Sequence, residues 1–232
     1  VSDVHAGPYM PAARMRRIRD QVMQLEPDLV VFTGDQLDRR PDDARRFISG
    51  FEGIEAPLGV YGVLGNHDHQ AGSTIATSAL EAAGIRPLVN DTAVLARGSA
   101  RLAIAGVDDV SAPFPHRPDF SILHRHPDAY RLCLSHQPRA WPEAEAAGAH
   151  LTLSGHTHGG QFALTRRNIN VARLQGRFIV GPYRREDSFL FVSRGVGVGA
   201  VPVRFGAPSE IDLLTLRSER AVAAELADEA AA

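Results

Sequence analysis

The stretch Asp28-Leu29-Val30-Val31-Phe32-Thr33-Gly34-Asp35 decides the fold class, because it has the form of a short buried strand that ends in a turn. Its centre is apolar and rich in β-branched and aromatic side chains, and the pair Gly34-Asp35 ends the run. On its N-terminal side, apolar residues recur at steps of three and four across Pro11–Leu25, which predicts an amphipathic helix. A helix followed by a buried strand is the repeating unit of an α/β protein.

The same alternation of helices and strands continues along the chain. A second helix is predicted to end within Phe47–Ile54, and further helices are predicted at Ser73–Ala83 and Arg139–Ala147. Strands are predicted at Gly59–Leu64, Val94–Ala96, Leu102–Val107, Arg131–Leu134, Leu151–Leu153, Phe189–Ser193 and Ile211–Leu216. Interleaved helices and strands of this kind indicate an α/β fold.

Composition limits the chemistry that the chain can perform. Of 232 residues, 44% are hydrophobic and 22% are charged, as in an ordinary globular domain. The net charge of −2 gives no field that would attract a nucleic-acid polymer, so none is expected as a partner. The single cysteine, Cys133, excludes a thiolate metal cluster, whereas ten histidines are available. Any metal site must therefore use nitrogen and oxygen ligands.

The domain organisation is predicted to be simple. There is no internal repeat and no linker, so residues 1–217 are expected to form one domain, followed by an alanine- and glutamate-rich tail at 218–232. Residues Val1–His5 have the pattern of the last step of a strand whose body is missing, so the first strand is expected to be truncated. No apolar run is long enough to span a bilayer. The chain as given is expected to be soluble, and either cytoplasmic or peripheral to the membrane or cell envelope through a missing N-terminal segment.

Polar side chains follow the predicted strands in five places. Each place puts Asp, Asn or His at the carboxyl end of a strand, where ligand sites of α/β sheets form. In chain order the five blocks are Asp3-Val4-His5, Gly34-Asp35, Gly65-Asn66-His67-Asp68, Ser135-His136 and Gly155-His156-Thr157-His158.

The spacing within these blocks fits metal binding. The pairs Asp3/His5 and His156/His158 are two residues apart, so in an extended chain both side chains of a pair project to one face. Together with Asp35, Asn66 and His136 they supply seven donors, more than one ion needs, which indicates two divalent ions. Asp35 is expected to bridge them, because it arrives alone and charged from its strand. Such mixed donors suit Mn, Fe or Zn.

The ordered blocks, together with Asp38 three residues after Asp35, resemble the calcineurin-like metallophosphoesterase superfamily. The extended stretches 2–10, 155–161 and 193–206 resemble its bacterial branch, which contains membrane- or cell-envelope-associated phosphodiesterases. The resemblance implies two packed β-sheets flanked by helices. It also implies ligand roles and catalytic roles for particular residues. One metal would be held by Asp3, His5, Asp35 and His158, the other by Asp35, Asn66, His136 and His156, with His67 as proton donor and Asp38 as its acidic partner.

The expected activity is hydrolysis of a phosphoester, a diester rather than a monoester, by in-line attack of a metal-bridging hydroxide. His67 would protonate the leaving oxygen, and Arg39 would either clamp a phosphate oxygen or lie in an exposed charged turn. A lipid- or envelope-linked substrate is one expectation. A cyclic-nucleotide or other nucleotide phosphodiesterase and a non-catalytic scaffold are the alternatives. The other five histidines are expected at the surface or behind the ligands: His69, His116, His124, His126 and His150.

Overall fold

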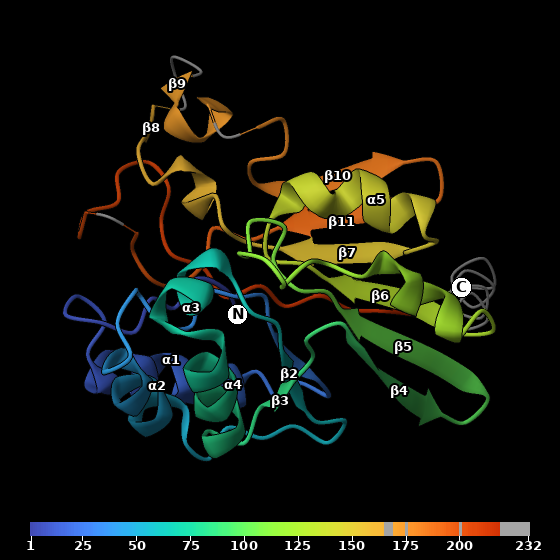
Figure 1. Cartoon of the computed structure of the whole chain (residues 1–232), viewed down its shortest axis with the longest axis horizontal. Coiled ribbons are helices and arrows are strands. Elements are labelled where there is room, and N and C mark those ends of the chain that lie inside the picture. The colour runs from blue at the N-terminus through green and yellow to red at the C-terminus, as the bar shows by residue number, and fades with distance from the viewer. Residues whose placement is uncertain (165–168, 175, 200, 219–232) are drawn as a thin grey trace, which may run out of the picture.

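Two β-sheets pack face to face, and helices cover their outer faces, in a computed structural model of the chain (Figure 1). The structure describes residues 1–164, 169–174, 176–199 and 201–218. The predicted tail, except for Ser218, lies outside the described residues. The predicted fold class, two packed sheets flanked by helices, is confirmed.

The smaller sheet has three parallel strands and the larger sheet has six. The smaller sheet has the order β1-β2-β3, with β1 at Val30–Phe32, β2 at Val60–Gly62 and β3 at Arg86–Pro87. The larger sheet has the order β10-β11-β7-β6-β5-β4. Its strands span Asp91–Arg97 (β4), Ala100–Gly106 (β5), Tyr130–Leu134 (β6), Leu151–Ser154 (β7), Gly181–Arg185 (β10) and Ser188–Val192 (β11). Strands β11, β7, β6 and β5 are mutually parallel, and the two edge strands pair antiparallel to them.

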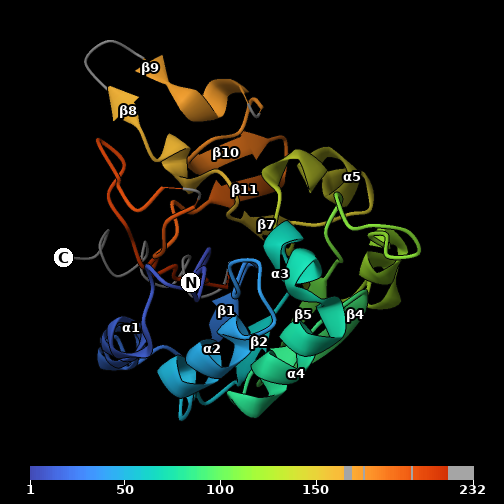
Figure 2. The ribbon, with the colours of Figure 1, turned by 60° about the vertical axis from the view of Figure 1, so that its left-hand side comes forward.

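The helices lie on opposite sides of this pair of sheets (Figure 2). Helices α1, α2 and α4 lie beside the small sheet, whereas α5 and the 3-10 helix η1 lie beside the large one. Their bounds are Ala12–Gln24 (α1), Asp43–Phe51 (α2), Asn66–Ala71 (α3), Ser73–Ala82 (α4), Phe120–Arg125 (η1) and Trp141–Ala146 (α5). Shorter elements are η2 (Pro138–Ala140), η3 (His158–Gly160), β8 (Ala163–Leu164), β9 (Ile169–Asn170) and η5 (Val171–Leu174).

Strand β6 shows how the large sheet separates two parts of the core. Leu132 and Leu134 pack with Val63 in the layer between the sheets, whereas Cys133 packs with Ala144 of α5 on the opposite face. Successive side chains of a strand point to opposite faces, so a strand with continuous apolar sequence is buried on both. This explains why the sequences of the predicted strands are continuously apolar and do not alternate between apolar and polar residues.

Two sequence predictions differ from the structure. The strand predicted at Ile211–Leu216 is wrong, because these residues form no strand, and Leu213 and Leu216 are exposed. β-type composition produces a strand only where a sheet edge accepts it. Helix α3 was not among the predicted elements. It begins at Asn66, directly after Gly65, and the Asp68 carboxylate accepts the Gly65 N–H at 2.9 Å.

The first residues run beside the chain that follows β1. The Asp3 N–H donates to the Gly34 carbonyl at 3.1 Å and the His5 N–H donates to the Asp35 carbonyl at 2.9 Å, although Asp3 and His5 are not part of a regular strand. On the other side, the Val196 N–H donates to the Ser2 carbonyl at 3.0 Å. The segment is therefore held between two neighbours. Among the described residues, no helix combines the length and the apolar character that crossing a bilayer requires.

The buried position of Cys133 gives a test of the core. Burial raises the pKa of the Cys133 thiol to about 12, and the thiolate is the reactive form. We expect no labelling by a thiol reagent such as dithionitrobenzoate at pH 8 in the native protein, and one thiol per chain in guanidinium chloride. Rapid labelling without denaturant would contradict the packing of β6 against α5.

Candidate metal centre

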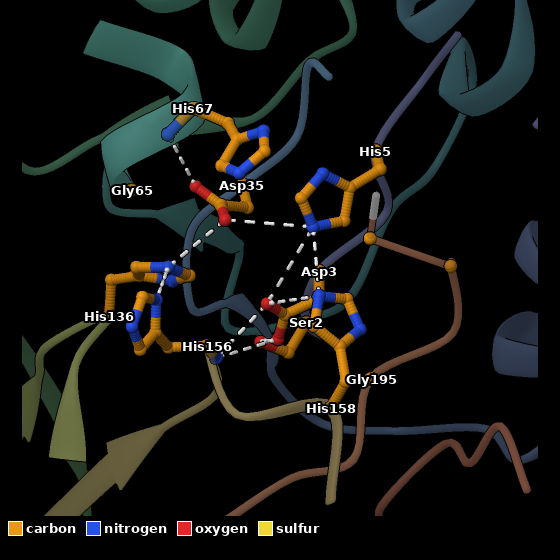
Figure 3. A network of polar contacts seen from close by, with 12 residues as sticks. Ser2, Asp3, His5, Asp35, Gly65, His67, His136, His156, His158 and Gly195 are labelled. Carbon is orange, nitrogen blue, oxygen red and sulfur yellow. Dashed lines mark hydrogen bonds and ion pairs between the residues drawn. The ribbon is translucent and has the colours of Figure 1, made fainter. Parts of the chain in front are cut away.

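The five polar blocks converge on one place, although they are distributed over residues 3 to 158 of the sequence. Loops after β1, β2, β6 and β7 meet the N-terminal segment there (Figure 3). These loops follow the carboxyl ends of parallel strands, which is where α/β sheets form ligand sites. The structure therefore brings together the residues that the sequence predicted as ligands.

Asp35 lies between two groups of histidines (Figure 3). Its Oδ2 atom is 3.2 Å from His136 Nε2 and 3.6 Å from His5 Nε2. Its Oδ1 atom accepts the backbone N–H of His67 at 2.9 Å, which fixes the carboxylate. Burial disfavours the charged form, but His136 and His5 hold the pKa of Asp35 well below its usual value. The carboxylate is thus ionised and shared between both groups.

The Asp3 cluster, which consists of Asp3, His5 and His158, has ligand atoms that all lie within 4.8 Å of one another. His5 Nε2 and His158 Nε2 are 3.0 Å apart, and Asp3 Oδ1 is 3.6 Å from His158 Nε2. The His156 N–H donates to both Asp3 oxygens at 3.0 Å, so this carboxylate is also fixed. Burial lowers the pKa of His158 to about 3, which keeps its ring neutral and able to bind a metal.

The His136 cluster, which consists of Asp35, His136 and His156, lies on the other side of Asp35. His136 Nδ1 is 2.9 Å from the Thr33 carbonyl, so Nδ1 carries a hydrogen and Nε2 is the ring atom that faces Asp35. His156 Nδ1 is 3.1 Å from His136 Nε2. The Asn66 Oδ1 atom is buried without a hydrogen-bond partner among the described residues.

These features fit bound divalent metal. Ring nitrogens of different histidines face each other at 3.0–3.1 Å, with fixed carboxylates beside them, so several donors of metal-binding type converge within a short distance. Burial lowers the pKa of His136, but Asp35 outweighs it and raises the value to about 10. Burial and the nearby His136 lower the pKa of His156 to about 4. The carboxylates of Asp3 and Asp35 thus stabilise positive charge in the site, which either a protonated histidine or a bound metal ion can supply.

His67 lies beside both clusters, with its ring centroid 4.6 Å from that of His5. Its Nδ1 atom is 2.5 Å from the Asp38 carbonyl and 3.4 Å from Asp38 Oδ1. A ring with Nδ1–H bonded to a carbonyl keeps Nε2 for a reacting atom. Arg39 is exposed, and its Nε is 3.5 Å from His67 Nδ1. Asp38, which also lies 3.5 Å from His5 Nδ1, is close to both histidines.

Glycines next to the ligands are required for two different reasons. Gly34 has a φ of 98°, a left-handed conformation that favours glycine, as its predicted turn role implies. Gly65 and Gly155 have no such φ, and at these positions the requirement is space. A Cβ on Gly65 would overlap the Asp35 carboxylate, and one on Gly155 would overlap Ser2 Oγ and Asp3 Oδ2.

Asp68 is a supporting residue to which the sequence analysis assigned no role. Its buried carboxylate accepts N–H groups of Gln36, Leu37 and Gly65 at 2.9–3.2 Å. It therefore joins the loop that carries Asp35 to the start of α3. Burial and the nearby Asp35 raise the pKa of Asp68 to about 7. The adjacent Asn66 and His67 were the only sequence signal for such a role.

Arg204 supports the other side of the site. Its guanidinium donates to the carbonyls of Gly197 at 2.8 Å and Arg194 at 2.8 Å, and it lies 3.1 Å from His158 Nδ1. The contact with His158 joins residues that are 46 positions apart in sequence. No local pattern could have revealed it.

The histidines outside the predicted ligand set differ in their surroundings. His69 Nε2 bonds Asp108 Oδ1 at 2.6 Å, and His116 Nδ1 lies 3.5 Å from Asp108 Oδ2. His150 Nδ1 accepts the Arg131 N–H at 2.9 Å. The expectation of a surface or supporting position therefore describes His150 well, whereas His69 belongs to a buried hydrogen-bonded pair.

Comparison with known proteins agrees with this site. The profile of the family "calcineurin-like phosphoesterase" matches residues 1–160. The chain is 33% identical over 226 residues to the uncharacterized metallophosphoesterase YkuE of Bacillus subtilis, which covers 94% of this chain and 77% of that protein. The chain therefore belongs to the calcineurin-like metallophosphoesterase family. This confirms the resemblance, and the Bacillus relative is consistent with a bacterial branch.

Other relatives extend beyond the matched region. A bovine "transmembrane protein with metallophosphoesterase domain" is 32% identical, over 94% of this chain and 52% of its own length. A putative 5'-nucleotidase from Staphylococcus aureus has the same fold, with a TM-score of 0.56 at 14% identity, covering 98% of this chain and 57% of that chain. The chain thus spans about half the length of these two proteins.

The crowding at Gly155 gives a test of the site's assembly. We expect Gly155→Ala to displace Ser2 and Asp3, lower bound metal at least tenfold and destabilise the fold by about 2 kcal/mol. Metal content by elemental analysis and urea unfolding would measure both effects. Gly98→Ala is the control, because Gly98 has left-handed φ but open space around its Cβ position. Normal metal content in Gly155→Ala would contradict the site geometry.

Proposed function

We propose that the chain is a phosphoesterase with a binuclear metal centre. One ion would be held by the Asp3 cluster together with Asp35, and the other by the His136 cluster together with Asn66. The observation that carries the proposal is the position of Asp35, whose carboxylate contacts histidines of both clusters. A carboxylate shared in this way would contribute to the binding of both ions.

Bound divalent cations would neutralise the phosphoester and make a bound water acidic enough to attack phosphorus at neutral pH. The nitrogen and oxygen donors suit Mn, Fe or Zn. The chain's own contribution is to hold these donors in place, because fixed charges need no rearrangement when the reaction occurs. Hydrogen bonds from backbone N–H groups to Asp3 and Asp35 perform that function.

We assign His67 as the group that protonates the leaving oxygen and Asp38 as the residue that orients it. The contacts of His67 Nδ1 with Asp38 leave Nε2 for the substrate. Burial lowers the pKa of His67 and the nearby Asp35 opposes this effect. Proton transfer from a positioned imidazole raises rates typically by 10²–10⁴ when the leaving group is a poor one.

We assign Arg39 to a phosphate oxygen that the metals do not hold. Its exposed side chain lies beside His67, where a substrate would enter, and its guanidinium offers several donors in one plane. Hydrolysis of diesters, and a lipid- or envelope-linked substrate at a membrane, are further parts of the proposal. A nucleotide phosphodiesterase remains the alternative activity.

The role of His67 predicts a dependence on the leaving group. His67→Ala should retain both metals but lose about 10²–10³ in kcat for an alkyl phosphodiester, and much less for a p-nitrophenyl diester. The nitrophenolate ion leaves without a proton, whereas an alkoxide needs one. Elemental analysis and kinetics on both substrates with Mn²⁺ would test this.

Asp35→Asn provides the contrasting variant, because it should lose bound metal and activity on both substrates. Equal losses on the two substrates in His67→Ala would contradict the acid role. Activity near that of the wild type in both variants would refute the proposed function itself.

The assignment of Arg39 predicts an effect on KM. Arg39→Gln should raise KM about tenfold while changing kcat little, because the contact is made in bound substrate and transition state alike. Arg40→Gln is the matched control, since Arg40 is also exposed and its side chain has no partner in the described part of the chain. Equal KM values for the two variants would assign Arg39 to an exposed charged turn.

A further inference from the structure

A pocket of about 390 Å³ adjoins the His136 cluster. Its lining residues are Asn66, His69, Gln70, Ser111, Pro113 and His156. Two of them, Asn66 and His156, are proposed metal ligands. A phosphoester bound at the metals would therefore have one of its substituents at the mouth of this side pocket.

Helix α3 explains why the pocket and the proposed acid are separate. Asn66, His69 and Gln70 are spaced by three and four residues, so they share one face of the helix. His67 lies on another face, toward His5 and Asp38. One short helix thus presents a different histidine on each side of Asn66.

His69 is fixed so that one ring nitrogen remains for a ligand. Its Nε2 atom is 2.6 Å from Asp108 Oδ1, and the two side chains are only 3% and 2% exposed. Asp108 is itself held, because its Oδ1 also accepts the Asp109 N–H at 2.9 Å. A carboxylate only accepts, so Nε2 carries the hydrogen. Nδ1 has no protein partner among the described residues.

Ser111 is fixed so that its hydroxyl hydrogen remains for a ligand. Its Oγ atom accepts hydrogen bonds from Gln137 Nε2 and from the Arg139 guanidinium, each at 2.7 Å. Gln137 is in turn held by the buried carboxylate of Asp109 at 2.9 Å. With both lone pairs of Ser111 Oγ engaged, its own hydrogen is the bond that remains to be made. The pocket therefore presents a ring nitrogen and a hydroxyl donor.

We propose that this side pocket binds one alcohol substituent of the phosphoester, on the side of Asn66 away from His67, and selects one that carries further hydroxyl groups, such as a glyceryl group, with His69 and Ser111 as specificity-determining residues. The inference rests on the proposed phosphoesterase function. One hydroxyl can donate to His69 Nδ1 and another can accept from Ser111. A hydroxyl also suits His69 in its charged form, because the oxygen then accepts from Nδ1–H.

The other lining groups favour the same class of ligand. The described lining residues include no arginine, the side chain that favours a second phosphate, and the adjacent Arg139 donates to Ser111. They also include no phenylalanine, tyrosine or tryptophan on which a nucleobase would stack. Asn66 and Gln70 supply amide groups, which pair with hydroxyls.

The test compares methyl glyceryl with methyl propyl phosphodiester on the Mn²⁺-loaded protein. The two esters differ only by two hydroxyl groups. We expect kcat/KM for the glyceryl ester to exceed that for the propyl ester about tenfold or more in the wild type, because two hydrogen bonds are gained. Calorimetric binding of the corresponding hydrolysis-resistant phosphonates should show the same preference without turnover.

Three variants test whether the preference for glyceryl esters depends on the residues of the pocket. Ser111→Ala, at an exposed position, and His69→Leu should each lower the glyceryl-to-propyl ratio about threefold, because each removes one of the two hydrogen bonds. His124→Leu, an exposed histidine outside the pocket, should leave it unchanged. If His69→Leu fails to fold because Asp108 loses its partner, Ser111→Ala decides the question.

The possible failures are distinguishable. If the wild type hydrolyses a p-nitrophenyl diester but shows no preference for glyceryl esters, or does not hydrolyse them, the pocket assignment is overturned and the phosphoesterase proposal is not. A preference that is undiminished in both pocket variants overturns it as well. If no phosphoester is hydrolysed at all, the proposed function fails and this inference fails with it.

Discussion

The shared carboxylate of Asp35 is the constraint on which the rest of the site depends. It must lie near His5 and His136 at the same time, at 3.6 Å and 3.2 Å, and both side chains come from distant parts of the sequence. Its orientation is set by the backbone N–H of His67, so helix α3 must begin at a fixed place. A small displacement of either loop would separate the two clusters, because each uses the same carboxylate.

Buried polar support keeps these loops in place. Asp68 joins the Asp35 loop to α3 through three backbone N–H groups, and Arg204 joins His158 to the segment around Gly197. Leaving a buried polar group unpaired would cost about 1–3 kcal/mol, so each of these hydrogen bonds helps to hold its loop in place. Gly65 and Gly155 add a steric requirement, since a side chain at either position would overlap a carboxylate.

Much of the fold was predictable because the apolar runs are bounded by clear turn residues. Strands such as Val30–Phe32 and helices such as Ala12–Gln24 lie where their patterns indicated. The strand expected at Ile211–Leu216 failed because its apolar residues matched a local pattern without a sheet edge to receive them. Helix α3 was not predicted, because a helix of six residues is too short to show a helical periodicity in its sequence.

The sequence by itself determined the donor types and the family. One cysteine and ten histidines exclude thiolate ligation, and the polar blocks at strand ends predict an oxygen and nitrogen site. Only the tertiary structure decided which side chains meet. Contacts such as Arg204 with His158 and His69 with Asp108 join residues 46 and 39 positions apart, and no local pattern encodes them. The physical reason is that sequence spacing fixes the face of an element, whereas packing of the two sheets fixes which faces come together.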